Sequence, residues 1–176
     1  MIQRVFRGLA ALSGATLVVL LAPAAQERQP AGAGKAVTDA EFVTKAASGG
    51  MFEVQSSKLA VEKATKAECK TFAETMIRDH TKANAELKAA AGKAGVTVPA
   101  ALSPDHQKML DGLKTARDFD AAYLAAQLKA HEEAVALFTA ASTSVKDAAL
   151  RDFAAKTLPT LKMHLEHVKK HGGGPR

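Results

Sequence analysis

The amino-acid sequence predicts an all-α protein, a ferritin-like four-helix bundle with a long, partly helical crossover between its second and third main helices. Alanine is abundant and β-branched residues are sparse, and this composition favours helix. Apolar residues recur at steps of three, four and seven along four long segments, as on the buried face of an amphipathic helix. The middle connection is long, whereas the other two are short. That arrangement is typical of ferritin-like bundles rather than of simple up-down bundles.

Residues 1–24 have the features of a secretory signal peptide. A short basic region precedes an apolar run at residues 9–21, which is too short to cross a bilayer comfortably. Small residues at 22–24 match a cleavage site. Residues 25–37 contain Pro and Gly without helical periodicity and are expected to form a flexible leader. The protein is therefore expected to be exported, to the periplasm or another extracytoplasmic compartment, with no transmembrane segment in its mature chain.

The first main helix is expected to start at Thr38, because Thr38 and Glu41 match a capping box. Its apolar or small face continues to about Ala64. This face includes the adjacent pair Gly49 and Gly50, which are tolerated inside a helix where a neighbouring chain approaches closely or where the helix kinks. The bundle domain is expected to extend from residue 38 to residue 171.

A second capping pattern, Thr65 with Glu68, predicts the start of the second main helix. This helix is expected to run to about Ala91, where two glycines follow and end it. The crossover comes next. It contains a short helix that begins with Ser103 as its cap and Pro104 at its first position.

The third main helix is predicted at about residues 118–141. The fourth is predicted from a capping pattern at Ser144 to about Lys170. Pro159 lies inside the fourth helix and is expected to kink it, because proline removes one backbone hydrogen bond. Residues 172–176 are rich in glycine and are expected to form a disordered tail.

One polar residue lies at or near the inward face of each main helix. Three are histidines, and the first helix contributes Glu53. At a rise of about 1.5 Å per residue, all four lie in the middle third of the bundle, where bundle proteins build cofactor sites. Imidazole and carboxylate groups suit zinc, copper, iron and manganese. The candidate ligands of one transition metal ion are therefore Glu53, His80, His131 and His164, with supporting contacts or alternative ligands from Asp79, Asp120, Tyr123 and Gln127.

The same residues could instead be buried polar ties that fix the register of the helices. Each histidine would then bond to a group on a neighbouring helix, for example His80 to Glu53 or His164 to Tyr123. A ferritin-type di-iron centre is disfavoured, because such centres use Glu-x-x-His on two helices. The residues three positions before His80 and His164 are not carboxylates.

Other functional classes have little support in the sequence. The formal net charge is +6, but Lys and Glu alternate along the helices without a basic block, so no nucleic acid is expected as a partner. The single cysteine, Cys69, is expected to be a buried apolar residue. His164, His167 and His171 follow one side of the fourth helix and could bind a surface metal ion, although a solvated helix end is the simpler interpretation. Peripheral association with the cell envelope and formation of a homo-oligomer stay open.

Several short motifs recur here in a characteristic order: Asp39-x-x-Phe42, Glu53, Met76-x-x-Asp79-His80, Pro99, Phe119-Asp120-x-x-Tyr123, His131 and Leu158-Pro159-x-Leu161-x-x-His164. In this order and spacing they resemble the bacterial family called domain of unknown function 4142. The resemblance covers about residues 38–170. It implies an exported, ferritin-like helical bundle and leaves the reaction, if any, open.

Two functional hypotheses follow from the sequence. The first is a structural, stress-related or binding role in the cell envelope, with no catalytic residue assigned. The alternative is a divergent metal-binding ferritin-like protein or a metal-dependent oxidase that uses the mid-bundle His and Glu residues. Of these, the oxidase requires both a stoichiometric metal ion and a water-accessible cavity in the middle of the bundle.

Overall fold

The computed structural model describes residues 36–172, and all regular secondary structure within them is helical. The helices are α1 (Asp39–Lys63), α2 (Ala67–Lys93), α3 (Pro104–Lys114), α4 (Phe119–Ser144) and α5 (Ala148–Gly172). The all-α prediction is therefore confirmed. The expected signal peptide, residues 25–35 of the expected leader and residues 173–176 of the expected tail lie outside the described residues. Across residues 36–172, no helix combines the length and the apolar character needed to span a membrane.

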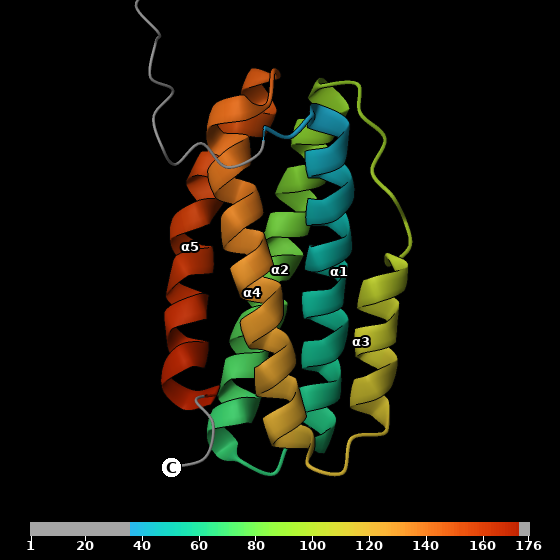
Figure 1. Ribbon diagram of the computed structural model, residues 1–176, viewed down its shortest axis with the longest axis vertical. Coiled ribbons are helices and arrows are strands. Elements are labelled where there is room, and N and C mark those ends of the chain that lie inside the picture. Colours follow the sequence, from blue (N-terminus) through green and yellow to red (C-terminus); the bar gives the residue numbers. More distant parts are fainter. Residues whose placement is uncertain (1–35, 173–176) are drawn as a thin grey trace, which may run out of the picture. The chain divides into compact units, whose positions relative to one another are not determined.

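The four long helices lie side by side as a bundle, and the shorter α3 packs outside it against α1 (Figure 1). The helices α1 and α5 run in one direction, and α2 and α4 run in the other. The parallel orientation of α2 and α4 requires the chain to return along the bundle between them, and residues 94–118, which include α3, make this return. This is the connectivity that the sequence predicts.

The starts of α1 and α3 follow their local capping signals. The hydroxyl of Thr38 accepts a hydrogen bond from the Glu41 N–H at 3.2 Å, and the Glu41 carboxylate accepts one from the Thr38 N–H at 3.0 Å. Ser103 caps α3 in the same way, through the N–H of His106 at 3.3 Å. Both caps were expected, because each depends only on residues three positions apart.

The expected capping box at Thr65 is wrong. The cap of α2 is Lys66, which has no capping side-chain bond. The carboxylate of Asp120, on α4, accepts hydrogen bonds from the N–H groups of Thr65 and Lys66, each at 3.0 Å, and from the Thr65 hydroxyl. A charged acceptor on a neighbouring helix therefore replaces the local cap and ties the α1–α2 turn to α4.

At the other end of the bundle, Asp39 connects the start of α1 to the turn between α4 and α5. Its carboxylate, in the first turn of α1, accepts a hydrogen bond from the N–H of Lys146 at 2.7 Å, in the turn between α4 and α5. That turn is also fixed locally, since Asp147 accepts the N–H of Leu150 at 3.0 Å. Asp147 rather than Ser144 therefore caps α5, while Ser144 is the last residue of α4. Helix α5 continues on both sides of Pro159.

The interior consists of two apolar clusters with a polar layer between them. The first cluster includes Phe42, Leu87, Phe138, Leu150 and Phe153. The second includes Phe52, Phe72, Met76, Tyr123 and Val168. Along α2, α4 and α5, the inward histidine always falls between residues of one cluster and residues of the other. The polar layer is thus set at mid-height by the apolar side chains on either side of it.

Candidate metal centre

Three buried histidines meet in this polar layer. His80 comes from α2, His131 from α4 and His164 from α5, and they are 6%, 0% and 2% exposed. The centroids of their rings form a nearly equilateral triangle with sides of 5.5, 5.5 and 5.6 Å. One ring nitrogen from each histidine lies within 4.8 Å of the corresponding nitrogens of the other two. The arrangement can therefore offer three nitrogen donors to one ion.

A backbone contact fixes the tautomer of His131. Its Nδ1 lies 2.9 Å from the carbonyl oxygen of Gln127, one turn earlier on α4. A carbonyl only accepts hydrogen bonds, so Nδ1 carries the proton and Nε2 keeps its lone pair. Nε2 is buried and has no hydrogen-bond partner. This is the tautomer that a metal ligand at Nε2 requires.

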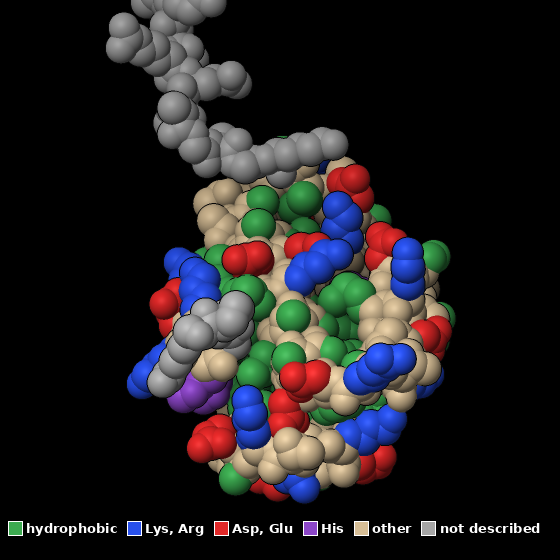
Figure 2. Space-filling model, turned by 60° about the horizontal axis from the view of Figure 1, so that its bottom comes forward, with side chains coloured by type: hydrophobic (Ala, Val, Ile, Leu, Met, Phe, Trp, Pro, Cys, Tyr) green, Lys and Arg blue, Asp and Glu red, His purple; other side chains and the backbone are tan. Residues whose placement is uncertain are grey.

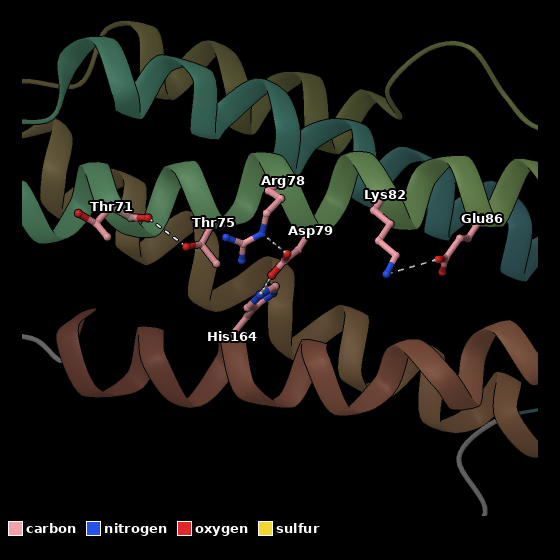
Figure 3. Close-up of polar contacts among 7 residues, drawn as sticks. All are labelled: Thr71, Thr75, Arg78, Asp79, Lys82, Glu86 and His164. Atoms are coloured by element: carbon pink, nitrogen blue, oxygen red, sulfur yellow. Dashed lines mark hydrogen bonds and ion pairs between the residues drawn. The ribbon is translucent and has the colours of Figure 1, made fainter.

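A carboxylate fixes the tautomer of His164. Nε2 of His164 donates to Oδ2 of Asp79 at 3.0 Å, and Oδ1 of Asp79 accepts a hydrogen bond from Nε of Arg78 at 2.9 Å (Figure 3). Burial favours a higher pKa for the Asp79 carboxyl, but the hydrogen bonds from Arg78 and His164 hold its pKa below the ordinary value. The carboxylate is therefore ionised, and Nδ1 of His164 keeps its lone pair. This nitrogen is also buried without a partner.

All three imidazoles are neutral at neutral pH. Burial lowers the pKa of His131 to about 4. Burial, together with the neighbouring His131 and His164, holds the pKa of His80 well below its usual range. Burial also lowers the pKa of His164, although Asp79 opposes this. Because a metal ligand must be deprotonated, the cluster can bind an ion without first losing protons.

Glu53 lies on the other side of His131. Its Oε1 is 3.5 Å from Nδ1 of His131, and Oε2 is buried without a hydrogen-bond partner. Burial raises the pKa of Glu53 to about 8, although a hydrogen bond with Gln127 opposes the shift. At neutral pH this carboxyl is therefore protonated. The structure thus brings three of the four expected ligands together and places Glu53 behind His131, outside the three-nitrogen group.

The expected supporting residues divide into two groups. Asp79 and Gln127 contact the histidines directly, and the Gln127 amide also donates to the Ser56 hydroxyl at 3.0 Å. The other two hold helices together: Tyr123 bonds the Ser57 hydroxyl at 2.8 Å, and Asp120 caps the α1–α2 turn. The example partners expected for His80 and His164, Glu53 and Tyr123, do not form those hydrogen bonds.

The sequence did not predict the contact between Arg78 and Asp79. Arg78 precedes the Asp79-His80 pair, and this adjacency is the only signal that could have indicated its role. Asp79 points to His164 of α5 (Figure 3). The next residue, His80, is buried inside the bundle. Consecutive residues on a helix lie on different faces, so one short segment of α2 serves both purposes.

Two openings border the cluster. A partly open cavity of about 640 Å³ is lined by Glu53 and His80 together with mainly apolar residues of α1, α4 and α5. A more open groove of about 480 Å³ lies between α2 and α5 and has His164 in its wall. One histidine of the cluster thus contributes to the lining of each opening.

Fold and site together define an all-α bundle with a buried, neutral three-histidine cluster at mid-height. The chain belongs to the family described as a domain of unknown function, DUF4142, whose model matches residues 22–170. The family expected from the sequence motifs is thereby confirmed. No curated protein matches the chain.

Several solved structures have a similar fold. CopM in the Cu(II)-bound form has a TM-score of 0.67 and 22% identity, covering 78% of this chain and 97% of that chain. CopM in the Ag-bound form has a TM-score of 0.64 and 21% identity, covering 77% and 95%. A DUF305 fragment from Deinococcus radiodurans has a TM-score of 0.65 and 15% identity, covering 76% and 94%. At these identities the likeness is one of fold.

Proposed function

We propose that this protein is an exported helical-bundle protein of the cell envelope that binds one transition metal ion through His80, His131 and His164. The observation that carries the proposal is the convergence of three buried imidazoles whose ring nitrogens lie within 4.8 Å of one another. The proposed role is binding, and no residue is assigned to catalysis.

The free nitrogens support a ligand role over a role as core ties. His164 bonds Asp79 of α2 through Nε2, but a tie of this kind uses one ring nitrogen and does not account for the other. Nε2 of His80, Nε2 of His131 and Nδ1 of His164 are all buried without a partner. Buried polar atoms without partners cost about 1–3 kcal/mol each, so proteins rarely keep three together. A metal ion would bind all three nitrogens at once. The other ring nitrogens of His164 and His131 are hydrogen-bonded to Asp79 and to the Gln127 carbonyl, as is usual for histidines that bind metal ions.

The donor set consists of neutral imidazoles with neither a thiolate nor an ionised carboxylate, and imidazole suits zinc, copper, iron and nickel. The fold likeness to CopM, which was solved with Cu(II), Ag and Cu(I), favours copper among these metals. Nitrogens bound at about 2.0 Å around one ion lie roughly 3.3–3.5 Å apart. The nitrogens of the three rings lie within 4.8 Å of one another, so binding requires them to approach by up to about 1.5 Å.

A second function, a metal-dependent oxidase, is favoured by one observation. The cavity of about 640 Å³ reaches Glu53 and His80, so a small substrate could approach an ion held by the three histidines. The oxidase requires turnover with a reducing substrate and oxygen or peroxide. Stoichiometric metal without turnover would support the binding role and contradict the oxidase.

Metal analysis of the mature protein tests the proposal. The protein would be purified without a histidine tag, loaded with Cu(II) or with Cu(I) under reducing conditions, and exchanged into buffer with a weak competing ligand. We expect about one tightly held copper per chain, lost in the His80→Ala/His131→Ala variant and kept in His106→Ala. A wild-type chain that retains no copper, or a double variant that retains as much as the wild type, would overturn the proposal.

Export has a separate test. The features of residues 1–24 support it, and the mature N-terminus of protein recovered from the cell envelope should lie near residue 25. Recovery of the unprocessed chain from the cytoplasm would contradict this part of the proposal.

A further inference from the structure

An open groove lies between the first turns of α2 and the last turns of α5. Its volume is about 480 Å³, and its walls include Glu68, Phe72, Met163, His164, His167 and His171. Figure 2 shows histidine side chains gathered at one place on the face that it draws, while Lys, Arg, Asp and Glu are scattered over the rest. The groove thus brings three histidines and one methionine together in its lining.

Met163 is an exposed methionine in the wall of the groove. Its side chain is 58% exposed, and no other large hydrophobic residue in the described part of the chain is exposed. The thioether borders the groove, next in sequence to the buried His164. Thioethers are soft donors that prefer Cu(I) to harder ions.

The other two donors form a stack that leads inward. His167 and His171 are four residues apart on α5, with ring centroids 4.5 Å apart. His167 also stacks on Phe72 of α2 at 4.5 Å, and the edge of Phe72 meets His164 at 6.3 Å. The stack therefore connects the exposed His171 to His164, which belongs both to the groove wall and to the buried cluster.

We propose that this groove is the entrance through which copper reaches the buried three-histidine site, with Met163, His167 and His171 as weaker donors that capture Cu(I) first. The inference rests on the proposed function. It adds a second binding site on the surface and a direction of loading. His164 lines the groove and also belongs to the buried cluster, where its Nδ1 is buried without a partner and would receive the ion.

The larger cavity is the competing route, because it reaches His80 of the buried cluster and contributes one further histidine. That histidine is His106, whose Nδ1 lies 2.7 Å from the Ser48 hydroxyl and whose ring stacks on Phe52 at 5.3 Å. The Ser48 hydroxyl also accepts the N–H of Ser103 at 2.8 Å. His106 is thus held in a network that joins α1 to the start of α3.

The rate of Cu(I) transfer from a coloured chelator complex tests the entrance. The variant Met163→Leu/His167→Gln/His171→Gln removes the groove donors, and His106→Gln removes one imidazole from the larger cavity. We expect the triple variant to reach the same final stoichiometry of tightly held copper as the wild type, but at least 10-fold more slowly. His106→Gln should load at the wild-type rate. Melting temperatures of the metal-free variants would show that each retains its fold.

The groove can also be tested without the buried site. In the His80→Ala/His131→Ala variant we expect weak Cu(I) binding to persist and to disappear when the three groove donors are also replaced. Loading of the triple variant at the wild-type rate would overturn the entrance, as would slower loading of His106→Gln alone. If the wild type loads no copper while the groove still binds Cu(I) weakly, the proposed function and the entrance fail but the surface site stands.

Discussion

The carboxylate of Asp79 on α2 lies 3.0 Å from Nε2 of His164 on α5, and the same carboxylate holds Arg78 at 2.9 Å (Figure 3). This contact orients the His164 ring, fixes its tautomer and makes Nδ1 a stronger donor. It also links the two helices that border the groove. The Asp79 carboxylate therefore affects both the orientation of a ligand in the buried cluster and the position of the two helices that border the groove.

Replacing Asp79 with Asn should weaken copper binding by about 10- to 100-fold, the usual effect of losing a group that supports a ligand. Asn keeps the size of the side chain but loses the charge that selects the Nε2–H tautomer. Competition with a chelator of known affinity measures the change. The matched control is Asp111→Asn, which removes an exposed carboxylate paired with Lys114 at 2.8 Å. Equal affinities in the two variants would contradict the role given to Asp79.

A His80→Leu variant separates a ligand from a core tie. His80 has a buried Nε2 without a partner, and leucine fills a similar volume without a polar atom. We expect the metal-free variant to gain about 1 kcal/mol of unfolding free energy while it loses tight copper binding. Urea unfolding measures the first quantity and metal analysis the second. If His80→Leu loses much more unfolding free energy than the surface control His171→Ala, His80 is a buried polar tie between helices and not a metal ligand.

The sequence predicts which faces and ends of the helices matter, because these depend on local spacing. The period of the helix alone places His80, His131 and His164 inward, and all three are buried in the structure. The capping pairs of α1 and α3 are equally local, and both form. Features of this kind follow from residues three or four positions apart.

Contacts between helices could not be predicted in the same way. Asp79 and His164 are 85 positions apart, and Asp120 and Thr65 are 55 apart. Their pairing depends on the rotation and height of each helix, which the packing of the two apolar clusters sets. A height estimate good to one turn places Glu53 near the histidines, but it cannot show that Glu53 faces Nδ1 of His131 rather than the shared centre.

The pKa of Glu53 predicts how stability depends on pH in the metal-free protein. The folded value is about 8 and the ordinary value 4.5, so the stabilisation from the neutral form is fully present below pH 4.5 and is lost as the pH rises through 8. His131, with a folded pKa of about 4 and an ordinary value of 6.5, acts in the opposite sense and costs stability as the pH falls below 6.5. Between pH 6.5 and 8 the effect of Glu53 should therefore dominate.

In that window the unfolding free energy of the wild type should fall by up to about 1.4 kcal/mol per pH unit. Glu53→Gln, which cannot ionise, should remove the decline. The exposed Glu132→Gln should keep it. Urea unfolding at half-unit steps of pH provides the measurement, and a decline of the same slope in Glu53→Gln would show that another group is responsible.

The adjacent glycines of α1 should respond to alanine in opposite directions. A Cβ on Gly49 would meet the His106 ring at 3.9 Å, an ordinary contact, so Gly49→Ala should add up to about 1 kcal/mol through helix propensity. A Cβ on Gly50 would lie 1.9 Å from Oδ1 and 2.9 Å from Cγ of Asn84 on α2. Gly50→Ala should therefore destabilise the protein by about 1–3 kcal/mol, the usual cost of overpacking.

The double variant Gly50→Ala/Asn84→Ala identifies the cause of that loss. If the close approach of Asn84 is responsible, removing its amide makes room for the new methyl group, and the double variant should be more stable than Gly50→Ala alone. Thermal unfolding of the wild type, Gly50→Ala, Asn84→Ala and the double variant completes a double-mutant cycle. A coupling energy near zero would contradict this explanation. The loss in Gly50→Ala would then arise within α1 and not from the contact between Gly50 and Asn84 of α2.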